Sequence, residues 1–128
     1  MKLAAIILWL FGLITLAFGV WALLAPTQFA ALAHYGLDHP GAVTELRAFY
    51  GGVEIGLGVF WILGALRQPL TRAALVSMIS IWSGVVIARG LGLVLDGSGS
   101  TTMLVVLGTE IAAVIGAAIA LNRLPASQ

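Results

Sequence analysis

The stretch that decides the fold is the first apolar run, LAAIILWLFGLITLAFGVWALL, at residues 3–24. It contains no charged side chain. At about 1.5 Å per residue, an α-helix of this length is long enough to cross the bilayer hydrocarbon core of about 30 Å. A secretory signal peptide is the alternative interpretation. Its apolar core would be only about 7–15 residues long and would be followed closely by a small-residue cleavage site. We therefore expect a transmembrane helix here.

Three further apolar runs follow, at residues 45–66, 71–95 and 101–121. Hydrophobic residues make up 61% of the 128-residue chain, whereas charged residues make up only 9%. A soluble domain carries about 25% charged residues, so this chain has too few charges to cover a water-facing surface. We expect one all-α domain over residues 1–128, folded as an integral membrane four-helix bundle.

The basic residues predict the orientation of this bundle. Four of them flank one set of helix ends: Lys2, Arg67, Arg72 and Arg123. The opposite connections, at residues 25–44 and 96–100, contain no Lys or Arg. Under the positive-inside rule the basic ends face the cytoplasm. Both termini are therefore expected in the cytoplasm, in a multi-pass protein of the bacterial inner (cytoplasmic) membrane.

The first outer connection is expected to contain a short helix at about residues 26–35. Pro26 suits the first turn of a helix, and Gly36 suits the position after its last residue. Phe29 and Leu32 would give this helix an apolar side, so we expect it to lie in the membrane interface.

No metal, cofactor or nucleic-acid site is expected. His34 and His39, with Asp38 and Glu45 nearby, offer metal-ligating atoms, but we interpret them as exposed side chains of an irregular loop. No histidine lies within a predicted span, so haem is not expected between the helices. The absence of cysteine excludes a disulfide, a thiolate nucleophile and a zinc–thiolate site. A net charge of +1 without a basic tract gives no indication of nucleic-acid binding.

Four ionisable residues lie within the predicted spans: Arg47, Glu54, Arg89 and Glu110. Counted from the outer helix ends, their depths are roughly 5, 15, 10 and 13 Å, respectively. A charge at membrane depth is costly and normally faces the bundle interior, paired with another charge. Because the depths overlap and the charges cancel, we expect one connected cluster, a polar chamber in the outer half of the bilayer.

Helical periodicity adds residues to this chamber. Tyr50 and Trp61 share the charged stripe of the second span, and Trp82 and Asp96 share the stripe of Arg89. We expect Trp61 and Trp82 to form an aromatic floor on the cytoplasmic side of the chamber. The predicted site therefore consists of a polar cluster and two pocket aromatics: Arg47, Tyr50, Glu54, Arg89, Asp96 and Glu110, with Trp61 and Trp82.

Small residues are expected to shape the packing. Gly51 and Gly58 lie on the stripe of Glu54 and add no side-chain volume, so we expect them to leave room in the chamber. The last span carries a ridge of small residues roughly opposite Glu110: Gly108, Ala112, Gly116 and Ala120. This ridge either packs on another helix, in a homo-oligomer or a larger membrane complex, or seats the first span within the monomer.

Two stretches resemble a known family. They are TELRAFYGGVEIGLG at residues 44–58 and ARGLGLVLDG at residues 88–97. Both are similar to signature blocks of a bacterial membrane-protein family, domain of unknown function 4345, and the likeness extends over nearly the whole chain. The resemblance implies a four-helix bundle related to DoxX-like proteins and brings no established activity. The family's recurring residues would correspond here to Arg47, Tyr50, Gly51, Gly52, Glu54, Arg89 and Asp96.

The cluster leaves several functions open. In a binding or accessory protein, the arginines would hold the anionic or carbonyl head of an apolar molecule such as a lipid, quinone or isoprenoid. A membrane-embedded isomerase would use Glu54 and Glu110, and a small proton-coupled transporter would need a lone glutamate. Two arginines competing for these carboxylates count against proton transfer, so binding is favoured over catalysis. Alternatively, the charges only fasten the helices together. The expected partners are membrane lipid and an apolar small molecule with a polar head.

Overall fold

A computed structural model describes residues 1–32, 34–97 and 99–125 of the chain. The elements are α1 (Lys2–Leu24), α2 (Pro26–Leu32), α3 (Pro40–Leu46), the π-helix η1 (Arg47–Val53), α4 (Glu54–Leu66), α5 (Gln68–Asp96) and α6 (Thr101–Asn122). α3, η1 and α4 follow one another without a break and make one long helix. Among the described residues there are thus four helices that are long and apolar enough to cross a membrane. The all-α prediction is confirmed, and each of the four predicted spans falls within one of these long apolar helices.

The second long helix begins at Pro40, before the predicted start at residue 45, because His39 caps it. The His39 side chain accepts a hydrogen bond from the backbone N–H of Gly41 at 3.0 Å. Such a cap satisfies one of the free N–H groups of the first turn. His39 is therefore a helix cap in this fold.

The first connection contains the expected short helix, but α2 is shorter than predicted. It ends at Leu32, and Gly36 does not follow its last turn. The residue with a positive φ in this region is His34, at 57°. The predicted turn at residues 96–100 includes Ser98, which lies outside the described residues. Gly97, at a φ of 64°, ends α5 in the left-handed conformation that glycine adopts readily.

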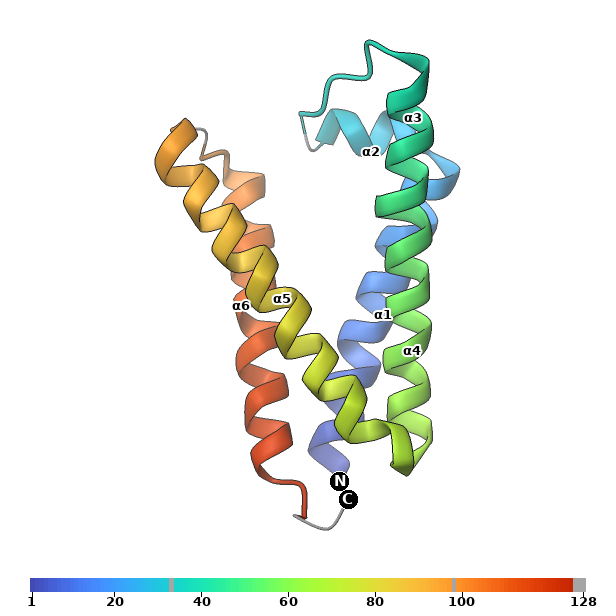
Figure 1. Cartoon of the computed structure of the whole chain (residues 1–128), viewed down its shortest axis with the longest axis vertical. Helices are drawn as coiled ribbons and strands as arrows, with labels where there is room; N and C mark the ends of the chain where they lie inside the picture. Colours follow the sequence, from blue (N-terminus) through green and yellow to red (C-terminus); the bar gives the residue numbers. More distant parts are fainter. Residues whose placement is uncertain (33, 98, 126–128) are drawn as a thin grey trace.

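The long helices associate as two pairs (Figure 1). α1 packs along η1 and α4, and α5 packs along α6. The start of α1, the α4–α5 connection and the end of α6 lie at one end of the bundle, where the pairs meet. The largest fully buried side chains lie in the core that joins them: Leu8, Trp61, Leu75 and Met78. Toward the other end the pairs diverge, and α2 lies at that end.

Glycines bring α1 and the second long helix unusually close. A Cβ atom at Gly58 would lie 2.7 Å from the backbone nitrogen of Leu16, and one at Gly51 would lie 3.2 Å from Leu23 Cβ. Such contacts let two helix backbones approach and pack tightly in a membrane. The expectation that Gly51 and Gly58 leave room in a chamber is therefore wrong, because both face α1.

The small-residue ridge of α6 divides into two parts. A Cβ atom at Gly116 would lie 3.0 Å from Ile7 Cδ1, and Ala120 is buried. This half of the ridge therefore packs against α1. At Gly108 a Cβ atom would meet nothing within 4 Å, and Ala112 is exposed. The intramolecular interpretation thus holds at Gly116, whereas the half near Gly108 faces outward.

Candidate functional site

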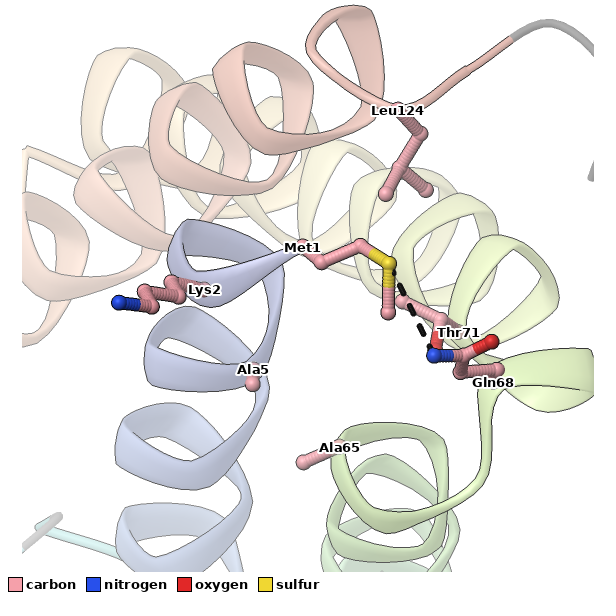
Figure 2. A pocket seen from close by; sticks show the side chains of 7 residues that line it. All are labelled: Met1, Lys2, Ala5, Ala65, Gln68, Thr71 and Leu124. Carbon is pink, nitrogen blue, oxygen red and sulfur yellow. Dashed lines mark hydrogen bonds between the residues drawn. The ribbon is translucent and has the colours of Figure 1, made fainter.

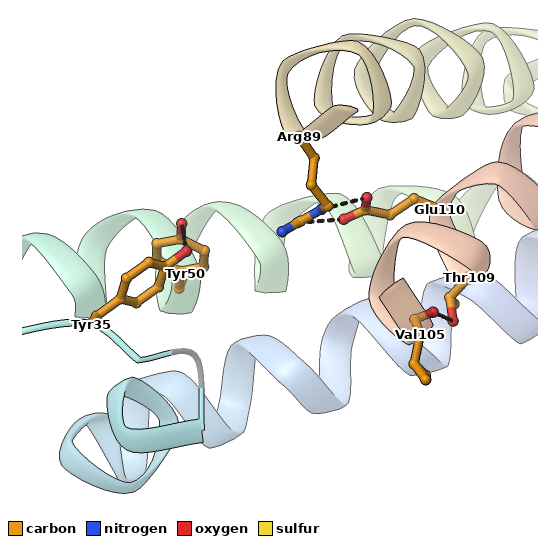
Figure 3. Close-up of polar contacts among 6 residues, drawn as sticks. All are labelled: Tyr35, Tyr50, Arg89, Val105, Thr109 and Glu110. Atoms are coloured by element: carbon orange, nitrogen blue, oxygen red, sulfur yellow. Dashed lines mark hydrogen bonds and ion pairs between the residues drawn. The ribbon is translucent and has the colours of Figure 1, made fainter. Parts of the chain in front are cut away.

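Arg89 of α5 and Glu110 of α6 form a bidentate ion pair between their helices (Figure 3). Arg89 Nε donates to Glu110 Oε2 at 2.9 Å, and an Nη atom donates to Oε1 at 2.7 Å. The side chains are 27% and 5% exposed, respectively. A bidentate arginine–carboxylate pair fixes geometry as well as adding energy. The pair therefore sets how α5 and α6 face each other.

A cavity of about 550 Å³ lies between the two helix pairs on the side of this ion pair. Its lining includes apolar side chains of α1, α5 and α6, and residues of α2, of the segment after it, and of η1 and α4. The described lining residues include the charged residues Glu54, Arg89 and Glu110 of the long helices and the titratable His34 of the segment after α2. The Phe, Tyr and Trp side chains among the described lining residues are Phe11, Phe18, Phe29, Tyr35, Tyr50 and Trp82. Pockets for small molecules measure roughly 300–1,000 Å³ and are mostly apolar, with a few polar groups.

Glu54 opens α4 and contributes a second carboxylate to the cavity. Its side chain is partly buried. Within the described ranges, no hydrogen bond or ion pair reaches its carboxylate. Arg89 is instead committed to Glu110. Glu54 is thus free to interact with whatever occupies the cavity.

The two tryptophans have different positions. Trp61 is fully buried in the core, and its indole N–H donates to Ser77 Oγ at 3.0 Å. Trp82 packs against it with ring centroids 6.0 Å apart, and Trp82 lines the cavity. The indole nitrogen of Trp82 is buried and has no acceptor among the described residues. The predicted aromatic floor is thus a single ring, Trp82, backed by Trp61.

An aromatic wall encloses the cavity at the α2 end. The hydroxyl groups of Tyr35 and Tyr50 lie 2.7 Å apart and share a hydrogen bond (Figure 3). The ring of Phe29, on α2, lies 5.5 Å from that of Tyr50, and Phe18 lies 6.3 Å from Phe29. Sequence reasoning placed Tyr50 in the site but missed Phe18, Phe29 and Tyr35. Their aromatic character was the available signal, but helix periodicity says nothing about a connection that folds back over a cavity.

Arg47 is not part of this arrangement. Its side chain is exposed, and its Nε donates to the carbonyl oxygen of Leu23 at 3.2 Å. Leu23 is in the last turn of α1, where carbonyl groups lack partners within the helix and attract cations. The expected cluster of four charges is therefore divided. The structure joins Arg89 to Glu110, places Glu54 in the same cavity, and directs Arg47 to the end of α1.

The π-helix η1 explains this separation. At α-helical pitch, seven residues make about two turns, which puts Arg47 and Glu54 on one face. In a π-helix the hydrogen bonds run five residues back, so each turn holds roughly one residue more. The seven residues of η1 therefore fall short of two turns, and Arg47 is rotated away from Glu54. π-helical segments are rare and often occur at functional sites.

Asp96 also lies apart from the cavity. It is the last residue of α5, its side chain is exposed, and it is not among the lining residues. The structure thus brings together Tyr50, Glu54, Arg89 and Glu110 of the predicted polar cluster.

A second, smaller hollow of about 240 Å³ lies at the end where the helix pairs meet (Figure 2). It is lined by Met1, Lys2, Ala5, Ala65, Gln68, Thr71 and Leu124. The Gln68 amide nitrogen lies 3.7 Å from the Met1 sulfur across it. Lys2 contributes a charged side chain, and the described lining residues include no carboxylate.

The four candidate spans indicate a multi-pass membrane protein, and its buried Arg89–Glu110 pair adjoins a cavity between the helices. The chain belongs to the family described as domain of unknown function (DUF4345), whose model matches residues 3–121. The resemblance seen in the sequence is therefore confirmed. No curated protein and no solved structure matches the chain.

Proposed function

We propose that this protein binds an apolar, lipid-like molecule of the lipid, quinone or isoprenoid kind. The apolar body occupies the cavity between the helix pairs, and the polar groups of the molecule meet Glu54 and Trp82. The volume of about 550 Å³ and the apolar lining from α1 and α6 support this proposal.

The observation that carries the proposal is that two polar groups of the cavity lining, the buried indole N–H of Trp82 and the carboxylate of Glu54, have no hydrogen-bond partner in the described part of the chain. Buried polar groups are normally hydrogen-bonded, and a buried donor left without a partner costs about 1–3 kcal/mol. A clasp that only fastens α5 to α6 needs the Arg89–Glu110 pair alone. Trp82 and Glu54 add nothing to such a clasp, whereas a bound molecule with polar groups would satisfy both.

A proton-coupled transporter is the second candidate, and Glu54 favours it. Such a mechanism needs a carboxylate that is free of an arginine, and Glu54 has no such partner within the described part of the chain. An isomerase using both glutamates receives less support. Both oxygens of Glu110 accept hydrogen bonds from Arg89, so Glu110 is not free to exchange protons with a substrate.

We also infer that the cavity lies toward the periplasm. The helix ends flanked by Lys2, Arg67 and Arg72 are at the opposite end of the bundle from α2. The positive-inside rule then places both termini in the cytoplasm. A cavity in the outer half of the membrane would exchange ligand with the outer leaflet or the periplasm.

Native mass spectrometry of the detergent-extracted protein tests the binding function. Val106→Trp adds a large ring to a residue that lines the cavity, whereas Val94→Trp adds the same ring on α5 at a residue that is 81% exposed. We expect an apolar adduct on the wild-type protein and on Val94→Trp, and its loss from Val106→Trp. The proposal fails if lipid, quinone and isoprenoid supplied during extraction all give no adduct, or if Val106→Trp retains it.

A further inference from the structure

We propose that the head group of the bound molecule is positively charged, so that the ligand is an apolar amine or quaternary ammonium ion. The inference rests on the proposed binding function and narrows its ligand class. Glu54 acts as the counter-ion, and the aromatic lining of the cavity faces the cation. Three features of the cavity support this proposal.

The first feature is the balance of charge in the lining. The long helices contribute two glutamates, Glu54 and Glu110, but only one arginine, Arg89. The expected balance of two arginines with two glutamates is lost because Arg47 donates to Leu23 outside the cavity. Among the described lining residues, which also include His34 after α2, there is therefore one more carboxylate than arginine, and this carboxylate attracts a cation.

The second feature is the commitment of Arg89. Two of its N–H groups already donate to Glu110, at 2.9 and 2.7 Å. An anionic head group would have to compete with this bidentate pair for the guanidinium, in a cavity that is also lined by the Glu54 carboxylate. A cationic head group leaves the pair intact and meets Glu54, whose carboxylate has no partner in the described part of the chain. The arrangement therefore disfavours the anionic head group expected from the sequence.

The third feature is the aromatic lining. Tyr35, Tyr50 and Phe29 form a wall of rings with neighbouring centroids 5.5 Å apart, and Trp82 lines the cavity as well. The faces of aromatic rings attract cations, and cages of aromatic rings hold quaternary ammonium ions in many proteins. A purely apolar ligand would be served equally well by aliphatic side chains.

Three probes with the same twelve-carbon chain test the head-group charge: dodecyltrimethylammonium, dodecanol and dodecanoate. Binding is measured by calorimetry on protein in phosphatidylcholine nanodiscs, at probe concentrations below micelle formation, with empty nanodiscs subtracted. Wild-type protein should bind the ammonium probe about ten- to a hundredfold more tightly than the other two. Equal or tighter binding of dodecanoate overturns the proposal.

Glu54→Gln removes the excess carboxylate while keeping the side-chain size. Its control is Glu45→Gln, because Glu45 is exposed on α3 and does not line the cavity. We expect Glu54→Gln to weaken the ammonium probe about tenfold or more and to leave dodecanol unchanged, while Glu45→Gln changes neither. Unaltered binding of the ammonium probe by Glu54→Gln contradicts the proposal.

A second variant covers the case in which Glu54→Gln does not fold. Tyr50→Leu removes one ring face at a partly exposed position and should weaken the ammonium probe selectively. Equal loss of ammonium and dodecanol contradicts the aromatic part of the argument.

The same titrations separate this inference from the proposed function. One outcome would support the binding function and contradict the cationic head group. In that outcome dodecanol binds, Val106→Trp prevents its binding, and the ammonium probe binds no more tightly than dodecanol. If no probe binds wild-type protein, both are wrong.

Discussion

Removing Arg89 and removing Glu110 should lower the free energy of unfolding by different amounts. Glu110 is only 5% exposed, whereas Arg89 is 27% exposed and reaches the cavity. In Arg89→Gln the carboxylate stays behind in a nearly closed environment, and we expect a loss of about 3–5 kcal/mol in the free energy of unfolding. In Glu110→Gln the arginine can be reached by water in the cavity and keeps an amide oxygen as acceptor, so about 1–3 kcal/mol is expected.

The measurement is reversible unfolding in mixed micelles, followed by circular dichroism. The double variant Arg89→Gln/Glu110→Gln should lose less than the sum of the two single variants, because neither charge is then left alone. Glu45→Gln, at an exposed position on α3, should change the unfolding free energy by less than about 0.5 kcal/mol. Equal losses in the two single variants, or additive losses in the double variant, would refute the assignment of a buried, coupled pair.

Three further predictions concern topology and packing. A cysteine in place of Gln68 should be protected from an impermeant thiol reagent in intact cells, whereas a cysteine in place of Gly99 should be labelled. Labelling of the cysteine at position 68 would contradict the predicted orientation. Gly58→Ala should lower the melting temperature, because the added Cβ would lie 2.7 Å from the backbone of α1. Gly56→Ala should be neutral or stabilising, because nothing lies within 4 Å of its added Cβ, and equal effects of the two variants on thermal unfolding would contradict the packing of α1 on α4. Gly116→Leu should lower the melting temperature without changing the oligomeric state seen by light scattering, since its Cβ would meet α1; a changed oligomer would show that this half of the ridge is shared between copies.

The four spans could be predicted because lipid imposes a length and a composition that each run meets by itself. Glu110 could be placed facing inward because a buried carboxylate needs a partner, and Arg89 was available at a similar depth. The position of Arg47 could not be predicted in this way. Projection onto a helix assumes one pitch throughout, and nothing in the residue types of η1 gives its hydrogen-bond spacing.

The packing role of the glycines could not be predicted from the sequence either. Gly51 and Gly58 share a face with seven-residue spacing, which is compatible both with a hollow and with a close approach of helices. Only the position of α1 decides between these, and that position depends on Gly12 and Gly19 of α1 as well. The aromatic wall from α2 was missed for a similar reason, because it depends on how a connection folds back over the bundle.

The pairing of the helices has a consequence for biogenesis. Each pair consists of segments that are consecutive in the chain, α1 with η1 and α4, then α5 with α6. Each can therefore form a hairpin as soon as its second helix has entered the membrane, before the other hairpin is made. The cavity belongs to neither hairpin and exists only after they dock. Since Arg67 and Gln68 are exposed at the single link, two separately translated halves cut there should reassemble into a protein with the same cavity.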